Sequence, residues 1–124
     1  MNTIVRSFLI ELARKKSNQI ITYQKLSDAC NLNLNMQEGD HVRAEIGRIL
    51  GEISKYENSF QRPFLSALVV RVGDQLEGDG FYKLAEELGF GDWKHLKKEG
   101  VFEIEQIKKC IEFWSNNSNY IKYK

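Results

Sequence analysis

The chain has no long apolar stretch and very little proline, cysteine, histidine or tryptophan. One of its 124 residues is proline, and two each are cysteine, histidine and tryptophan. No apolar run approaches the ~20 residues of a membrane-spanning helix. The N-terminal segment carries Arg6 and Glu11, with no signal-peptide core between them. We therefore expect no membrane contact and a cytoplasmic location.

The charge is almost balanced, which argues against nucleic acid as a partner. Eighteen Lys and Arg residues against seventeen Asp and Glu residues give a net charge of +1. Proteins that bind nucleic acid through its phosphates usually carry a basic excess. A local basic face stays open as an alternative, but the chain as a whole offers no field that attracts a polyanion.

The few cysteines and histidines form no pattern that holds a metal. Cys30 and Cys110 lie in amphipathic helical patterns, and we expect both to be buried as small apolar side chains. His41 and His95 are far apart and outside any ligand pattern, so we expect both to be exposed. The sequence predicts no disulfide, no metal, no cofactor and no catalytic residues, and therefore a protein that is not an enzyme.

What the chain does contain is a series of amphipathic helical patterns. Their spacing predicts helices over residues 3–16, 23–30, 41–56, 80–88, 92–98 and 103–114, followed by a tail at 117–124. The residues expected to cap these helices are Asn2 or Thr3, Thr22, Asp40, Asp79 and Asp92. Ile4 and Ile104 are also expected on buried faces. The predicted core consists of Val5, Phe8, Leu9, Leu12, Leu26, Ile46, Ile49, Leu50, Ile53, Leu65, Leu68, Val70, Leu84, Leu88, Ile107, Ile111 and Trp114.

One segment differs from the helical patterns. Residues 62–72 are typical of a β-strand, and a polar, glycine-rich turn follows at 73–80. A lone strand cannot satisfy its own backbone groups, and residues 19–22 are the only other extended candidate. The predicted fold class is α+β, mainly α, with five or six helices and a two-stranded antiparallel ribbon, winged-helix-like. We expect one domain over residues 1–124, with the winged-helix-like part at 19–88 and C-terminal helices at 92–116.

Two features in the middle of the chain are typical of a recognition surface. Gly47 and Gly51 lie inside a predicted helix, where each costs roughly 1 kcal/mol against alanine. Such a pair indicates either the close approach of another backbone or a groove for a ligand or partner. The amide-rich segment 31–39 is predicted to be a surface loop. In it, Leu34 and Met36 either dock on one side or present apolar anchors to a partner.

The turn at 73–80 carries three acidic residues, Asp74, Glu77 and Asp79. Their spacing matches part of a calcium loop, but the distal bidentate glutamate of an EF-hand is absent. Solvation of the turn and capping of the next helix explain all three side chains. The run Gly78-Asp79-Gly80 also leaves open the alternative that its backbone N–H groups bind an anion, although the lysine of a P-loop is absent.

Several short motifs together suggest a resemblance. They are Ile21-Thr22-Tyr23 with Leu26, the run Arg43-Ala44-Glu45-Ile46-Gly47-Arg48, Pro63 before Val69-Val70, and the turn from Gly73 to Gly80. In these motifs, residues 19–80 resemble the winged-helix, DNA-binding part of the alkylguanine-DNA alkyltransferases and alkyltransferase-like proteins. The resemblance implies DNA contacts by Tyr23, Arg43 and Arg48, with Arg43 helping to extrude a base. Phe64 stands where that family has its alkyl-accepting cysteine, so alkyl transfer, which needs a thiolate, is excluded at this site.

A second resemblance concerns residues 62–70 together with the run Gly78-Asp79-Gly80-Phe81-Tyr82. These segments look like small bacterial proteins of toxin and defence neighbourhoods.

We derive three functional hypotheses. The favoured one is a non-enzymatic protein-binding module, an immunity-type inhibitor that neutralises a bacterial toxin, such as a nuclease, by direct binding. Its partner-binding residues would be Leu34, Met36, Asp74, Glu77 and Asp79, with the acidic ones facing a basic toxin surface. The alternative is a DNA-binding protein that uses Tyr23, Arg43 and Arg48. The third is an enzyme built around a groove near Gly47 and Gly78, which would need two convergent titratable groups.

Overall fold

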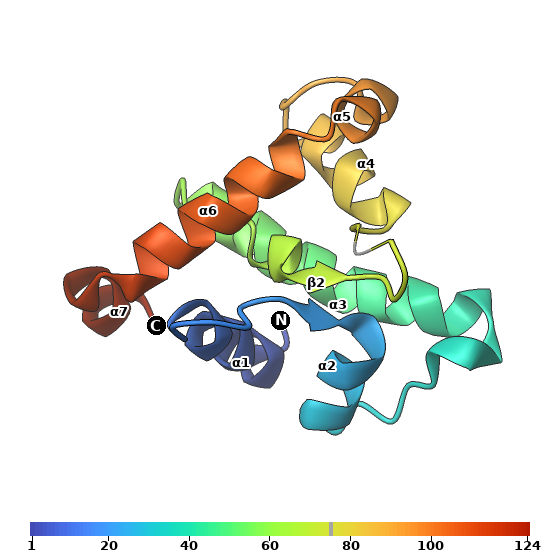
Figure 1. Ribbon diagram of the computed structural model, residues 1–124, viewed down its shortest axis with the longest axis horizontal. Helices are drawn as coiled ribbons and strands as arrows, with labels where there is room; N and C mark the ends of the chain where they lie inside the picture. Colours follow the sequence, from blue (N-terminus) through green and yellow to red (C-terminus); the bar gives the residue numbers. More distant parts are fainter. Residues whose placement is uncertain (75) are drawn as a thin grey trace.

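A computed structural model describes residues 1–74 and 76–124 as helices packed around one short pair of parallel strands (Figure 1). In chain order the elements are α1 (Thr3–Ala13), β1 (Ile21–Thr22), α2 (Tyr23–Ala29), η1 (Met36–Glu38), α3 (Asp40–Ser59), η2 (Leu65–Leu68), β2 (Val69–Val70), α4 (Asp79–Glu87), α5 (Trp93–Glu99), α6 (Phe102–Ser115) and α7 (Asn117–Tyr123), where η denotes a 3-10 turn. None of the helices in the described residues is long and apolar enough to cross a bilayer.

The helix starts are set by short polar side chains. Asn2, Thr22 and Asp92 each accept a hydrogen bond from the backbone N–H three residues later, which confirms them as caps. Asp40 and Asp79 are instead the first residues of α3 and α4. Their carboxylates lie in the first helical turn, where the helix dipole favours negative charge.

Within the predicted strand at 62–72, Leu65–Leu68 form the 3-10 turn η2 and only Val69–Val70 form the strand β2. Every residue from Phe64 to Val70 is buried, so the apolar run reflects enclosure on all sides rather than a half-buried strand. Ser54 of α3 lies 2.6 Å from the Ser66 hydroxyl and accepts the Ser66 N–H at 3.2 Å. The Gln106 side chain of α6 accepts the Phe64 N–H at 2.9 Å. These side chains supply hydrogen bonds that a strand partner would otherwise provide.

The strand pair runs in the opposite sense to the prediction. β1 and β2 are parallel, with Ile21 opposite Val69 and Thr22 opposite Val70. Helices α2 and α3 lie between the two strands in the chain, and such a crossover returns the chain in the same direction. The predicted antiparallel ribbon is therefore wrong. The winged-helix-like prediction is also wrong, because the described residues of the turn after β2 contain no strand that could form a wing.

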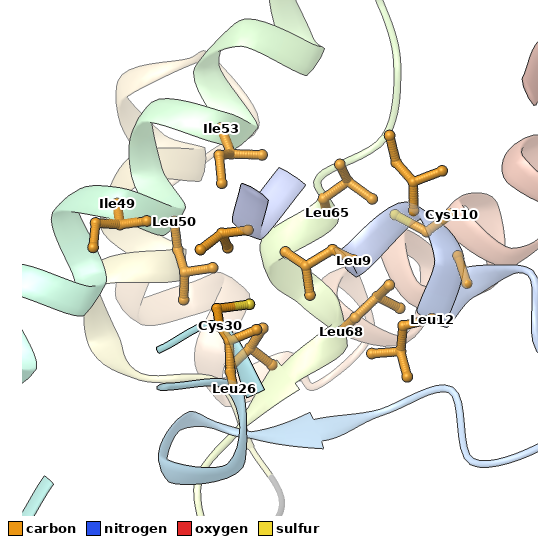
Figure 2. Close-up of a cluster of buried hydrophobic side chains, with 14 of the residues drawn as sticks. Leu9, Leu12, Leu26, Cys30, Ile49, Leu50, Ile53, Leu65, Leu68 and Cys110 are labelled. Atoms are coloured by element: carbon orange, nitrogen blue, oxygen red, sulfur yellow. The ribbon is translucent and has the colours of Figure 1, made fainter. Parts of the chain in front are cut away.

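The main core surrounds η2. Side chains from α1, α2, α3, η2 and α6 point toward one another there (Figure 2). The labelled residues are Leu9, Leu12, Leu26, Cys30, Ile49, Leu50, Ile53, Leu65, Leu68 and Cys110. Every predicted core residue is buried except Phe8, Leu88, Ile107 and Ile111, which are partly buried. Ile4, which was expected inside, is 68% exposed.

Helix α6 buries a different face from its most apolar one. Ile104 is 51% exposed, whereas Glu103 and Gln106 are almost fully covered. Gln106 faces inward because it binds the Phe64 N–H, and the Cys110 thiol donates to the Phe64 carbonyl at 3.0 Å. Hydrogen bonding to η2 therefore helps to select the buried face, which the hydrophobic pattern alone did not identify.

The predicted tail contains the seventh α-helix of the described residues, where five or six were expected. Asn116 caps α7 by accepting the Asn119 N–H at 3.0 Å. Arg14, which caps the C-terminus of α1, donates to the Trp114 carbonyl at 2.8 Å and to the Asn117 side chain at 3.0 Å. These bonds hold α7 beside α1, as Figure 1 shows.

A buried ionic cluster closes this part of the fold. The Glu57 carboxylate is fully buried and accepts hydrogen bonds from Arg6 Nε at 2.9 Å and Arg62 Nε at 3.0 Å. Arg6 also donates to the Tyr123 carbonyl at 2.8 Å. The cluster thus joins α1, the end of α3 and α7 through charged hydrogen bonds.

Candidate functional site

An open groove of about 1410 Å³ lies along the N-terminal half of α3. Its floor is formed by Arg43, Ala44, Ile46, Gly47, Leu50 and Gly51 of α3. The first wall consists of Tyr23, Gln24, Asp28 and residues 33–37, and the second wall of Arg71, Val72, residues 78–81 and Leu84. Ser66 also contributes to the lining. Apolar side chains from both walls and the floor make this a surface suited to an apolar ligand with polar edges.

The floor is open above both glycines of α3. A Cβ atom built on Gly47 or Gly51 meets nothing within 4 Å. The predicted close approach of another backbone is therefore wrong, and the groove alternative is the one that the geometry favours. Ala44, Gly47 and Gly51 together present a smooth helix face on which a ligand can come close to the α3 backbone.

The first wall is held in place by its own hydrogen bonds. Ser27 Oγ donates to the Leu34 carbonyl at 2.9 Å and accepts the Leu34 N–H at 3.1 Å. Gln24 accepts the Met36 N–H at 2.8 Å and donates to the Leu34 carbonyl at 3.1 Å. Leu34 and Met36 are partly buried against the main core and also line the groove. The first predicted alternative, docking on one side, is confirmed, and the role of the two residues as anchors for a partner stays a prediction.

The second wall is tied to the first by one phenol. The Tyr23 hydroxyl accepts the Gly78 N–H at 3.0 Å. Burial raises the pKa of Tyr23, so its hydroxyl stays protonated at neutral pH. The Arg71 N–H donates to the Leu76 carbonyl at 2.8 Å and so fixes the start of the turn.

Two of the three predicted acidic residues of the turn are exposed. Asp74 accepts the Leu76 N–H and pairs with Arg71 at 2.6 Å, and these contacts lower its pKa. Asp79 pairs with Lys97 of α5 at 2.5 Å, which lowers the pKa of Asp79. Asp79 lines the groove, whereas Asp74 lies outside the lining.

Glu77 is placed differently from the prediction. It is 1% exposed, so it cannot contact a partner in this conformation. It lies behind the second wall with Tyr82 of α4 and Glu103 of α6, and each of the three has a buried oxygen without a hydrogen-bond partner. Burial, and after it the charges of Glu103 and Asp74, raise the pKa of Glu77 to about 8. The same surroundings raise the pKa of Tyr82.

No sequence pattern predicted this polar cluster. Glu103 and Tyr82 each look like an ordinary residue of an amphipathic helix. Glu77 was expected to be exposed together with Asp74 and Asp79, and it is the one buried residue of the three. Glu77 is not among the residues that line the groove, so it cannot act as an acid or base on a groove ligand in this conformation.

The two arginines predicted to contact DNA are engaged with carboxylates. Arg43 lines the groove and pairs with Asp40 at 3.1 Å. Arg48 pairs with Glu45 at 2.6 Å and with Glu52 at 2.5 Å. Both arginines are exposed, so these pairs are weak and can be exchanged for other partners.

Two stretches of chain beside the groove are acidic, although the charged residues of the lining itself are balanced, with Asp28 and Asp79 against Arg43 and Arg71. Residues 26–42 contain Asp28, Glu38 and Asp40 and no Lys or Arg, and residues 72–82 contain Asp74, Glu77 and Asp79 and no Lys or Arg. All of these except Glu77 are exposed. Asp28 is a groove residue that sequence reasoning missed, because a lone acid on a short helix carries no distinctive pattern.

Among the described residues, no three His, Cys, Asp or Glu side chains are close enough to hold a metal ion. A comparison of the chain with known protein families, with curated proteins and with solved structures finds no match.

Proposed function

We propose that this protein is a non-enzymatic binding module, an immunity-type inhibitor that neutralises a bacterial toxin by direct contact. Its binding site is the α3 groove, and the occupant is a basic, amphipathic helical segment of the toxin. The observation that carries the proposal is an apolar groove, open over two glycines, between two acidic stretches of chain.

The shape of the groove supports a macromolecular occupant. Its volume of about 1410 Å³ exceeds the roughly 300–1,000 Å³ typical of small-molecule pockets. An amphipathic helix can lay its apolar face between Leu34 and Met36 on one side and Phe81 and Leu84 on the other. The bare Gly47–Gly51 face lets such a helix approach α3 closely.

The charge around the groove supports a basic occupant. Exposed carboxylates from residues 28–40 and 74–79 would surround the polar face of a bound helix. Complementary charges of this kind accelerate encounter and restrict the choice of partner more than they add affinity. They would also disfavour a polyanion, which is why DNA binding takes second place as the alternative.

The first experiment uses two synthetic helical peptides of equal length. Both carry leucine at i, i+3, i+4 and i+7, and one has lysine and the other glutamate on the polar face. We expect the lysine peptide to bind at least about tenfold more tightly at low salt and to weaken as salt is added. Equal binding of the two peptides, or no binding of either, would contradict the proposed groove occupant.

Two variants assign the peptide to the groove. Gly51→Phe fills the floor and should abolish binding, whereas Lys109→Phe adds the same side chain to an exposed site on α6 and should not. A DNA duplex serves as the second probe. Duplex binding that is lost in Arg43→Ala and retained in Gly51→Phe would favour the DNA-binding alternative instead.

The inhibitory activity is tested against a panel of purified bacterial toxins that includes any toxin whose gene neighbours that of this protein. We expect the parent chain to suppress toxin activity at equal stoichiometry and the Gly51→Phe variant to fail. Full toxin activity in the presence of excess parent chain would exclude the inhibitor function.

A further inference from the structure

The second groove wall is built on a buried carboxyl residue. The segment 76–80 passes from the turn after β2 into α4, and Gly78, Asp79 and Gly80 of this segment line the groove. Between the exposed Leu76 and the groove-lining Gly78, the Glu77 side chain turns inward and is 1% exposed. Glu77 thus belongs to the same short segment as Gly78, Asp79 and Gly80, so an opening of this segment that exposes Glu77 also moves the groove wall.

Burial penalises a negative charge on Glu77, and a hydrogen bond from its own backbone N–H offsets this penalty only in part. Glu103 of α6 is 4% exposed, and its Oε2 has no hydrogen-bond partner, like Glu77 Oε1 and the Tyr82 hydroxyl. Arg71, the nearby cation of the turn, pairs with Asp74 and leaves its buried Nε unpartnered. Two buried carboxyl groups that share a site cannot both be ionised without strong repulsion.

A short set of polar contacts closes the segment. Gly78 N–H donates to the Tyr23 hydroxyl, Arg71 N–H donates to the Leu76 carbonyl, and Phe81 N–H donates to the Gly78 carbonyl. Two further contacts are exposed: Leu76 N–H donates to the Asp74 side chain, and Lys97 pairs with Asp79. Opening of this segment breaks a small number of bonds and exposes one carboxyl group. A local opening on this scale is much less costly than global unfolding.

We propose that Glu77 and Glu103 form a pH-sensitive latch, which holds segment 76–80 against α4 and α6 in acid and releases it as the pH rises. The charged and titratable groups that face Glu77 are Glu103 of α6, Tyr82 of α4, Tyr23 of α2, and Asp74 and Arg71 of the turn. Of these, Glu103 and Asp74 are the carboxyl groups, and Asp74 is already bound to Arg71. The titration of Glu77 itself therefore drives the latch.

The pH range follows from the two states of Glu77. The pKa of Glu77 is raised from its ordinary 4.5 to about 8 by burial in the closed state, and returns toward the ordinary value in the open state. The opening constant of the segment therefore rises with pH between these two values, by at most about tenfold per pH unit, and levels off above them. The consequence for the groove, which alone rests on the proposed function, is that a bound segment is released at alkaline pH.

The test is amide hydrogen exchange of the free chain, with protection corrected for the intrinsic pH dependence of exchange. Between about pH 5.5 and 8 we expect protection at residues 76–82 to fall at least tenfold, while protection in α3 stays constant. Unchanged protection at residues 76–82 would overturn the proposal. No partner is present, so this result is independent of the groove function.

Three variants separate the latch from general loosening. Glu77→Gln cannot ionise and should remove the pH dependence. Glu103→Gln takes away the charge that raises the pKa of Glu77, so the fall in protection should be smaller and end at lower pH. Glu105→Gln, an exposed carboxyl residue of the same helix, should behave as the parent. A Glu103→Gln profile identical to the parent profile would contradict the coupling.

Comparing the affinity for the lysine peptide at about pH 6 and pH 9 then tests whether opening of the segment weakens binding in the groove. Opening of the segment without peptide binding would leave the latch standing and remove the groove function. Peptide binding that is independent of pH, with no opening of the segment, would support the groove function and overturn the latch.

Discussion

Tyr23, the first residue of α2, accepts a hydrogen bond at 3.0 Å from the backbone N–H of Gly78, so one phenol joins the two walls of the groove. The two residues are 55 positions apart in the chain. The contact makes the width of the groove depend on a single side chain.

Replacing Tyr23 by Phe should loosen the second wall. The variant leaves the half-buried Gly78 N–H without its acceptor, which costs about 1 kcal/mol of local stability. Amide exchange should be faster at Gly78. It should be unchanged at Gly89, whose N–H donates to the Glu86 carbonyl at the C-terminal end of α4. Equal protection of Gly78 in both proteins would show that the phenol does not restrain the wall.

The groove glycines should be replaceable by alanine with a gain in stability. Gly47 and Gly51 are helical and a Cβ meets nothing there, so each substitution should raise the free energy of unfolding by roughly 0.5–1 kcal/mol. Gly89→Ala is the matched control, because its φ of +91° disfavours any side chain and the substitution should destabilise the fold. Chemical denaturation measures all three, and a loss of stability in Gly47→Ala would contradict an open floor.

Removal of the buried carboxylate of α3 should be far more damaging than removal of an exposed one. Glu57→Ala leaves Arg6 and Arg62 facing each other without an anion, and should lower the free energy of unfolding by about 3–5 kcal/mol. Glu52→Ala breaks the exposed pair with Arg48 and should cost less than about 1 kcal/mol. Similar losses in the two variants would mean that the buried cluster contributes no more than a surface pair.

Global stability should decline between acid and mildly alkaline pH. Burial raises the pKa of Glu77 from 4.5 to about 8 on folding, so the folded chain holds this proton more tightly than the unfolded chain. The stabilisation is complete below the lower value and is lost as the pH rises to the higher one, by at most about 1.4 kcal/mol per pH unit. Urea denaturation across this range measures the slope. The Glu77→Gln variant should lack this contribution, and an unchanged slope in that variant would refute the assignment.

Periodicity identified six of the seven α-helices of the described residues and about half of the buried apolar side chains, because burial on one face leaves a clear apolar spacing in α1, α3 and α4. It was uninformative for η2, whose residues are enclosed on every side and so show no alternation. It was misleading for α6, where Gln106 and Cys110 face inward to bind the backbone of Phe64. Such choices depend on a contact between segments about forty residues apart, which no local pattern records.

The candidate site was partly accessible from the sequence. The two glycines, Leu34, Met36 and Asp79 were all singled out beforehand, and the structure brings them together in one groove. Glu77 was assigned to the surface because turns rich in glycine and acid are usually solvated. Its inward orientation depends on α6, which lies 26 residues further along the chain at Glu103.

The enclosure of η2 also bears on how the chain can fold. Helices α1, α3 and α6 all pack on this short turn, so its shell is assembled from both ends of the sequence. A fragment that stops at the end of α3 would lack the segment that α1 and α3 enclose, and the C-terminal half alone would lack two of its three neighbours. The chain should therefore not divide into autonomously folding halves, and the rate-limiting step of its folding should be the meeting of distant segments rather than the formation of any one helix.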